Sequence, residues 1–175
     1  MDTKKSRNPI GYTDLLGARG VSKSDLRIRL LGSIDEASAA LSVTKAFLPL
    51  EEDRVVLTNC QQDLSQLMGF IAQLGTEREA PEESDFFAEK LTNLESVLQS
   101  LKEQVVMPAR FIFPGENKAT GVLDFARATI RRVERELNAG FDALQVEALN
   151  ARQYLNRLST LCFLLILKHL DQDPA

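Results

Sequence analysis

Apolar residues recur at steps of three and four along most of this chain, with polar residues between them. That spacing predicts helices that each bury one face. A further stretch is apolar nearly all round from Leu161 to Leu167, which indicates the most buried segment. The predicted fold class is all-α, a five-helix bundle with short, up-down connections. The predicted helices span about residues 33–48, 51–74, 85–107, 119–138 and 144–170.

Capping and breaking residues suggest where these helices begin and end. Ser33-Ile-Asp-Glu36 fits a capping box that starts the first helix. Asp35 would then lie in the first turn, where a carboxylate favours the helix dipole by about 0.3–1 kcal/mol. Pro49 is expected to end that helix, and Gly140 is expected to close the fourth.

The first 32 residues show no sustained period, and their glycines and proline break regular structure. They are nonetheless too apolar for a freely solvated tail, which indicates an ordered arm laid against the body. We therefore divide a single domain into an N-terminal arm, residues 1–32, and a bundle, residues 33–175. The apolar residues of the arm are Leu15, Leu16, Ile28, Leu30 and Leu31.

Charge and hydropathy exclude several function classes. The 175 residues carry a net charge of -4, with a pI near 5.2. A general binder of nucleic acid or of membrane surfaces would show a broad basic patch, so neither partner is expected. No apolar run approaches the roughly 18 residues of a membrane span, and the polar start MDTKKSRNP lacks the core of a signal peptide. We expect a cytoplasmic protein.

Three residues that often carry chemistry are expected to be structural. Cys60 and Cys162 occupy apolar helix positions far apart in the sequence, without a CxxC spacing, and should be reduced and buried. The single histidine, His169, lies near the end of the last helix with no second ligand nearby and is expected to face that terminus. No protein-ligated metal site is predicted.

The helix at about 119–138 carries a charged side that borders its apolar side. At about 100° per residue, Arg127, Arg131, Glu134 and Arg135 fall together. Arginine presents planar donors suited to phosphate or carboxylate. The alternative is a solvated face held by ion pairs three and four residues apart. The pairs would be Arg131 with Glu134 and Arg132 with Glu136.

The first half of the last helix has a polar strip among its leucines. A polar strip on a central helix indicates contact with another subunit, a ligand or water. The strip consists of Arg152, Gln153, Asn156, Ser159 and Thr160.

Four segments, in this order, resemble one enzyme family: VSKSDLRIRLLGSIDEASAAL, FIFPG, ARATIRRVER and YLNRLS. The family is the ATP:corrinoid adenosyltransferases found with propanediol utilisation and in human mitochondria, and the likeness runs from about Gly11 to Leu167. It implies a ferritin-like five-helix bundle that assembles as a homotrimer, with an active site at each subunit interface. There Co(I) of cobalamin, or of a corrinoid precursor, attacks the 5′ carbon of ATP and triphosphate leaves.

The resemblance also implies partners and ligands. ATP would bind with Mg2+, a reductase would supply Co(I), and the corrin would be held without its lower axial ligand. Phe111 would cover the lower corrin face and displace that ligand, with Phe113 beside it as a second corrinoid contact. Arg127 would pair with Asp35 across the subunit interface. The ATP-binding residues implied are Gly11, Thr13, Lys23, Arg131, Arg132, Glu134, Arg135 and Asn156.

The chain departs from the family pattern at three places. Lys5-Ser-Arg-Asn-Pro9 stands where the family has a TxTGD-type phosphate loop, and Lys5 and Arg7 are candidates to replace it electrostatically. Glu116 replaces a glycine of the turn after FIFPG, and Thr160 replaces an aspartate after YLNRLS. The interpretations are therefore an active adenosyltransferase, or a non-catalytic corrinoid- or nucleotide-binding carrier, chaperone or sensor.

A third interpretation is a purely structural helical oligomer. In it, Arg127 and Asp35 would form an interface ion pair and no ligand would bind. An exposed pair contributes only about 0–1 kcal/mol, so stability alone explains the arginine cluster poorly.

Overall fold

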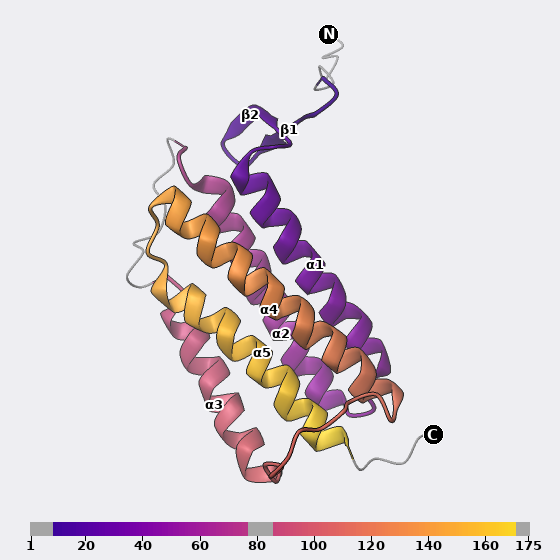
Figure 1. Cartoon of the computed structure of the whole chain (residues 1–175). Coiled ribbons are helices and arrows are strands. Elements are labelled where there is room, and N and C mark those ends of the chain that lie inside the picture. Colours follow the sequence, from indigo (N-terminus) through magenta and orange to yellow (C-terminus); the bar gives the residue numbers. More distant parts are fainter. Residues whose placement is uncertain (1–8, 77–85, 171–175) are drawn as a thin grey trace.

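The computed structural model describes residues 9–76 and 86–170, which form a helical bundle with a small two-stranded sheet at its start (Figure 1). The all-α prediction is confirmed in its main feature, and the sheet was not predicted. Asp85, the expected start of the third helix, lies outside the described residues. The elements are β1 (Tyr12–Leu15), β2 (Ala18–Ser22), α1 (Leu26–Phe47), α2 (Glu51–Gln73), α3 (Ala88–Gln104), α4 (Lys118–Leu144) and α5 (Leu149–His169).

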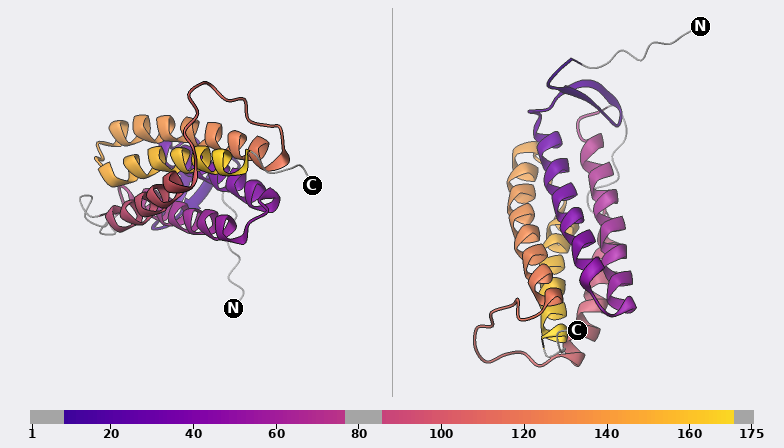
Figure 2. Two further views of the ribbon diagram at one scale, coloured as in Figure 1. Left: turned by 90° about the horizontal axis from the view of Figure 1, so that it is seen from below. Right: turned by 90° about the vertical axis from the view of Figure 1, so that its right-hand side faces the viewer.

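Successive helices run in opposite directions, as the short connections require. Helix α4 lies between α1 and α5, while α2 packs beside α1 and α3 beside α5 (Figure 1). The β1–β2 hairpin stands at one end of the bundle, and the segment 105–117 crosses the opposite end from α3 to α4 (Figure 2). Within the described ranges, no helix is long and apolar enough to cross a membrane.

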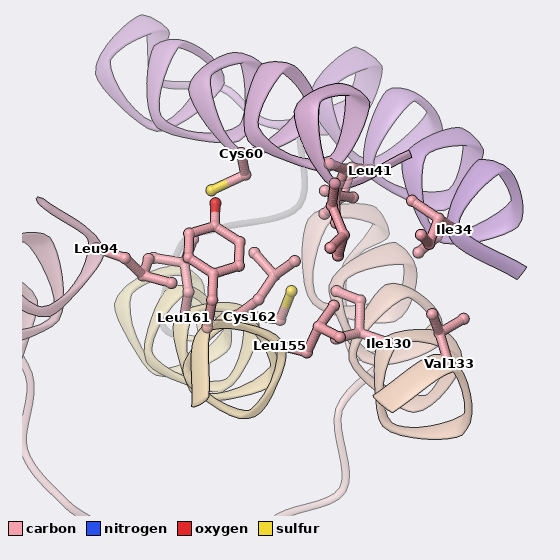
Figure 3. Packing of buried hydrophobic residues seen from close by; sticks show 14 of the residues in the cluster. Ile34, Leu41, Cys60, Leu94, Ile130, Val133, Leu155, Leu161 and Cys162 are labelled. Atoms are coloured by element: carbon pink, nitrogen blue, oxygen red, sulfur yellow. The ribbon is translucent and has the colours of Figure 1, made fainter. Parts of the chain in front are cut away.

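The core is a continuous set of mainly aliphatic side chains from all five helices, and its largest members are Tyr154, Phe70 and Phe141. Ile34 and Leu41 of α1 point toward Ile130 and Val133 of α4 and Leu155 of α5 (Figure 3). Each fully buried side chain of this size contributes about 1.5–3 kcal/mol. The prediction for the last helix is confirmed for residues 161, 162 and 164–166, which are at most 1% exposed, while Phe163 and Leu167 are only partly buried.

Helix α1 begins seven residues earlier than predicted, so the capping-box assignment at Ser33 is wrong. Asp25 caps the helix, because its Oδ1 accepts a hydrogen bond from the Arg27 backbone N–H at 2.9 Å. The Arg27 side chain also donates to the carbonyl of Leu74 at 2.8 Å and ties this start to the end of α2. Ser33 instead donates to the carbonyl of Arg29 inside the helix. Asp35 is therefore more than two turns inside α1 and not in its first turn.

The arm lies differently from the prediction, because residues 26–32 belong to α1. Residues 12–22 form the hairpin, in which Tyr12 pairs with Ser22 and Thr13 with Val21. The Asp14 carboxylate accepts from the Gly20 backbone N–H at 3.0 Å. The hairpin stands at the end of the bundle instead of lying against its side (Figure 2).

Gly140 does not close α4, which continues to Leu144 and ends with Gln145 in the left-handed conformation, at a φ of 58°. The glycine serves packing instead. A Cβ atom at Gly140 would lie 2.6 Å from both Cδ atoms of Leu30 on α1, too close for any real contact. Leu30 thus packs directly against the α4 backbone. Because α4 is longer than predicted, α5 begins at Leu149 and not near residue 144.

His169 does not face the terminus as predicted but is fully buried, with an exposed fraction of 0%. Its Nε2 lies 2.7 Å from Oδ2 of Asp53, in the first turn of α2. These residues are 116 positions apart, so no local pattern reveals the contact. Cys60 and Cys162 are free and buried, as predicted.

Candidate functional site

Two cavities meet on one side of the bundle, where α4 and α5 face the segment 105–117. The larger is about 550 Å³ and lies between residues 107–114 of that segment and α4. The smaller is about 260 Å³ and lies between α4 and α5. Arg127 and Phe163 line both cavities, so the two spaces adjoin. The remaining lining residues of the smaller cavity are Arg131, Ser159 and Thr160.

The start of α4 fixes the direction in which these arginines point. Asn117 caps the helix through a reciprocal capping box with Thr120. Arg127 and Arg131 follow one turn apart, on the side of α4 that faces α5. The smaller cavity therefore has cationic groups on one wall and hydroxyl groups on the other. Such a wall suits an anion with several oxygen acceptors.

Arg127 is held within its own helix. Its Nε and Nη2 donate to Oδ1 of Asp124 at 2.8 and 2.7 Å, and about a third of each side chain remains exposed. The partner implied by the family, Asp35, is exposed on α1. The Arg127–Asp35 contact is not formed inside one chain and stays a prediction for an assembly.

Glu134 and Asn156 join α4 to α5 beside the smaller cavity. Nδ2 of Asn156 donates to Oε1 of Glu134 at 2.9 Å. Two residues implied for ATP binding are thus brought together in the structure. Arg131 and Arg135 are exposed on the same helix, so their guanidinium groups are accessible to a ligand.

Arg132 points the other way, toward α1. Its guanidinium binds the carboxylates of Glu36 and Glu136, and the Glu136 bond measures 3.2 Å. The hydrogen bond that Arg132 donates to Glu36, and next the one that it donates to Glu136, hold the pKa of Arg132 above its ordinary value. The predicted Arg132–Glu136 pair is confirmed. Arg132 does not line either cavity, and its role in ATP binding stays a prediction.

Phe111 and Phe113 form an exposed aromatic wall on the segment 105–117. Their side chains are 82% and 79% exposed, and the rings meet edge to face with centroids 5.1 Å apart. Both residues line the larger cavity. Large exposed aromatic groups beside a cavity indicate a surface that binds an apolar or flat partner.

The hairpin residues implied for ATP binding lie elsewhere in the chain. Gly11 and Lys23 are joined by a backbone hydrogen bond of 2.8 Å at the base of the hairpin, and Thr13 lies on β1. The hairpin is at the opposite end of the bundle from the segment 105–117 (Figures 1 and 2). Lys5 and Arg7 lie outside the described residues. One chain alone therefore does not bring the whole predicted set together.

The sequence reasoning missed two cavity residues on the helices, Phe163 and Asp124, as well as Met107, Pro108 and Arg110 of the segment 105–117. Phe163 lies seven residues after Asn156, so the helical period already placed it on the same face of α5. Asp124 lies three residues before Arg127, the spacing of an ion pair within a helix. Both spacings follow from ordinary helix periodicity, which core residues also show. The sequence alone therefore does not distinguish these two residues from core residues.

The buried cysteines are not candidates for the chemistry. Burial raises the pKa of Cys60 to about 12, and burial likewise raises the pKa of Cys162. Both thiols are therefore protonated and poor nucleophiles at neutral pH. No group of three His, Cys, Asp or Glu side chains with the geometry of a metal site occurs among the described residues.

These features describe a helical bundle in which a cavity lined by Arg127 and Arg131 adjoins a larger, mainly apolar cavity with an aromatic wall. A sequence model of the cobalamin adenosyltransferase family matches residues 5–169. The chain belongs to this family.

Named relatives agree with the family assignment. The chain is 34% identical over 165 residues to the corrinoid adenosyltransferase PduO of Citrobacter freundii, which covers 93% of this chain and 48% of that protein. It thus spans about half the length of that relative. It is also 34% identical over 159 residues to the cobalamin adenosyltransferase of Cupriavidus metallidurans, with 89% of this chain and 80% of that protein covered.

A solved structure has the same fold. It is a variant PduO-type ATP:corrinoid adenosyltransferase from Lactobacillus reuteri complexed with cobalamin and ATP, which superposes with a TM-score of 0.80. The match covers 94% of this chain and 89% of that one, at 22% sequence identity.

Proposed function

We propose that this protein transfers the 5′-deoxyadenosyl group of ATP to Co(I) of cobalamin or of a corrinoid precursor. The observation that carries the proposal is the pair of adjoining cavities that share Arg127 and Phe163. One cavity has the cations that a triphosphate requires, and the other has the apolar wall that a corrin face requires. The two substrates can therefore meet at the boundary between them.

In this reaction the Co(I) centre of the corrinoid substrate is the nucleophile. A cobalt–carbon bond forms to C5′, the C5′–O bond breaks, and its electron pair leaves with the triphosphate, while cobalt passes formally from Co(I) to Co(III). The protein contributes by binding and orienting both substrates. Arg131 and Arg127 would stabilise the negative charge of the leaving triphosphate.

The aromatic wall has a separate role in the proposal. Phe111 lies against the lower face of the corrin, where its ring excludes water and a nitrogen ligand. Cobalt without a lower axial ligand is more easily reduced to Co(I), which a reductase would supply. Phe113 and Phe163 complete the apolar surroundings, the latter between the aromatic wall and the arginines.

The site is completed by a second copy of the chain. Helix α1 has 22 residues and spans about 33 Å at 1.5 Å per residue, so the hairpin and the segment 105–117 of one chain are too far apart to share a ligand. In a homotrimer, Gly11, Thr13 and Lys23 of one protomer would face Arg131, Glu134, Arg135 and Asn156 of its neighbour. Asp35 would then meet Arg127 across the same interface.

Mg2+ would enter this site with ATP. The ion typically keeps several waters and binds one or two carboxylates plus the phosphates of the substrate, so a cluster of protein ligands is not needed. Asp124 and Glu134 are the carboxylates of α4 that lie on the cavity side and contact Arg127 and Asn156. Free thiols and Co(I) both suit a reducing, cytoplasmic setting.

The test is an anaerobic absorbance assay with purified protein, chemically reduced cobalamin, Mg2+ and ATP. We expect loss of the Co(I) spectrum and appearance of a light-sensitive alkylcobalt product. Turnover would support the assignment as an adenosyltransferase. A perturbed corrinoid spectrum without product or triphosphate release would instead indicate a non-catalytic corrinoid-binding protein.

Arg131 and Arg132 provide a matched pair of variants for the same assay. Arg131→Ala should abolish transfer with the oligomer intact, because that side chain lines the smaller cavity. Arg132→Ala tests the implied role of Arg132 in ATP binding separately. Retained transfer in this variant would count against that role, because the guanidinium is engaged with Glu36 of α1 and with Glu136. Full activity of Arg131→Ala would refute the placement of the triphosphate.

A further inference from the structure

A buried polar cluster lies at the end of the bundle that the segment 105–117 crosses. Asp53 of α2 and His169 of α5 are 2% and 0% exposed. Oδ2 of Asp53 lies 2.7 Å from Nε2 of His169, and Oδ1 accepts from Nζ of Lys168 at 2.8 Å. A buried carboxylate costs desolvation free energy unless hydrogen bonds compensate for the lost water. Here the C-terminal end of α5 supplies these bonds to Asp53 at the N-terminal end of α2.

The charge on Asp53 fixes the direction of these hydrogen bonds. Burial by itself raises the pKa of Asp53, but the bonds from His169 and Lys168 outweigh burial and leave that pKa below its ordinary value. An ionised carboxylate can only accept, so Nε2 of His169 donates. The His169 ring, and with it the last turn of α5, is held against α2.

A chain of hydrogen bonds continues from His169 to the segment 105–117. Nδ2 of Asn117 donates to the carbonyl of His169 at 2.9 Å, and Oδ1 of Asn117 accepts from the Thr120 backbone at 2.9 Å. Oγ1 of Thr120 accepts in turn from the Gly115 backbone N–H at 3.2 Å. The C-terminal end of the segment is thus fixed to α4, α5 and α2 together.

The rest of the segment has few anchors of its own. Val105 and Ile112 are partly buried against the core, while Phe111, Phe113 and Val106 are 82%, 79% and 90% exposed. The direction of the aromatic wall therefore depends on how the ends of the segment are held.

We propose that Asp53, His169 and Asn117 act as positioning residues that set where the aromatic wall stands over the larger cavity. None of them lines that cavity, so they act through the segment and not on the corrinoid itself. This inference rests on the proposed role of Phe111 at the corrin face. It assigns a function in corrinoid binding to residues that do not line the cavity.

Asn117→Asp tests the link with little effect on α4. The aspartate retains an acceptor for the Thr120 N–H, and acidic residues are good helix caps, but it loses the donor to the His169 carbonyl. We expect the KM for cobalamin to rise and kcat to fall, each by about tenfold, since small misplacements cost up to about a hundredfold, with the KM for ATP unchanged. Asp53→Asn should act in the same direction.

Glu52→Gln is the matched control. Glu52 neighbours Asp53 and also binds Lys168, but its side chain is 70% exposed. This variant should leave both KM values and kcat as they are. An equal rise of both KM values in Asn117→Asp would indicate general damage and would overturn the proposal.

A second measurement does not depend on catalysis. Amide hydrogen exchange of residues 105–117, in the protein without ligands, should be faster in Asn117→Asp and Asp53→Asn than in the wild type and Glu52→Gln. Unchanged exchange there would overturn the proposal even if the enzyme is active. If the wild type makes no product, cobalamin affinity read from its absorbance replaces KM, and its loss in Asn117→Asp still supports positioning.

Discussion

Asn156 on α5 and Glu134 on α4 are joined by a 2.9 Å hydrogen bond beside the cavity that Arg131 lines. The bond leaves Glu134 fixed on the side of α4 that faces the ligand space. A carboxylate in that place can orient a guanidinium or accept from a ribose hydroxyl or metal-bound water. The polar strip of α5 is thus explained at this position by contact with its neighbouring helix.

Asn156→Asp should weaken ATP binding. It replaces the donor by a second carboxylate opposite Glu134, and both would repel a triphosphate. Loss of a hydrogen bond to a charged group costs about 1.5–3 kcal/mol, so we expect at least about tenfold weaker binding of Mg-ATP by calorimetry. Gln153→Glu adds the same charge to an exposed position of the same helix and should leave the affinity close to that of the wild type.

Phe111→Ala should reduce adenosyl transfer without lowering stability. The side chain is 82% exposed, so its removal leaves no cavity in the core, and the melting temperature should stay within a degree or two of the wild type. The rate with cobalamin should fall at least about tenfold with ATP affinity unchanged. Val106→Ala, in the same segment and 90% exposed, is the control. Equal rates for the two variants would contradict the role of the aromatic wall.

Asp53→Asn should show a stability defect that depends on pH. The folded-state pKa of Asp53 lies below the ordinary value of 3.8, so its carboxylate stabilises the fold above about pH 4, and this contribution is lost as the pH falls through the folded pKa. We expect a loss of about 3 kcal/mol at pH 7 that shrinks toward pH 3. Urea unfolding at the two pH values measures it; a defect of equal size at both would contradict the ionised pair.

Gly140→Ala should destabilise the bundle, and Gly121→Ala should not. Both glycines lie inside α4, where alanine is favoured by about 1 kcal/mol. At Gly140 the new methyl group would meet Leu30 at 2.6 Å, whereas at Gly121 its nearest neighbour is 3.7 Å away. Overpacking costs about 1–3 kcal/mol, so the two variants should shift the free energy of unfolding in opposite directions.

The sequence predicted what depends on periodicity and missed what depends on distant partners. The predicted steps of three and four residues between apolar positions are confirmed in α2, where Leu57, Cys60, Leu64, Leu67 and Ile71 are buried, and the end of α5 is also buried. Ser33 fits a capping box as well as Asp25 fits a cap, and the contact of Arg27 with the carbonyl of Leu74 favours the latter. In the sequence, Gly140 has the features of a glycine that ends a helix. Its packing role depends on Leu30 of α1, a distant residue in the sequence.

The same division holds for the candidate site. The helical period places Arg127, Arg131 and Glu134 on one side of α4. The structure packs α5 against α4, so that Asn156 of α5 contacts Glu134. The opposite direction of Arg132 depends on two carboxylates, one of them on α1. His169 was misplaced because its partner, Asp53, lies 116 residues away.

The two thiols of this protein, Cys60 and Cys162, are both buried and protonated. The native cysteines should therefore not react with thiol-specific labels. A cysteine placed at Ile10 or Val106, which are 103% and 90% exposed, would react with a maleimide probe ahead of either natural one. Spin labels at these two positions would lie beyond about 33 Å in a lone bundle. A shorter separation would report a neighbouring protomer directly, without removal of any native residue.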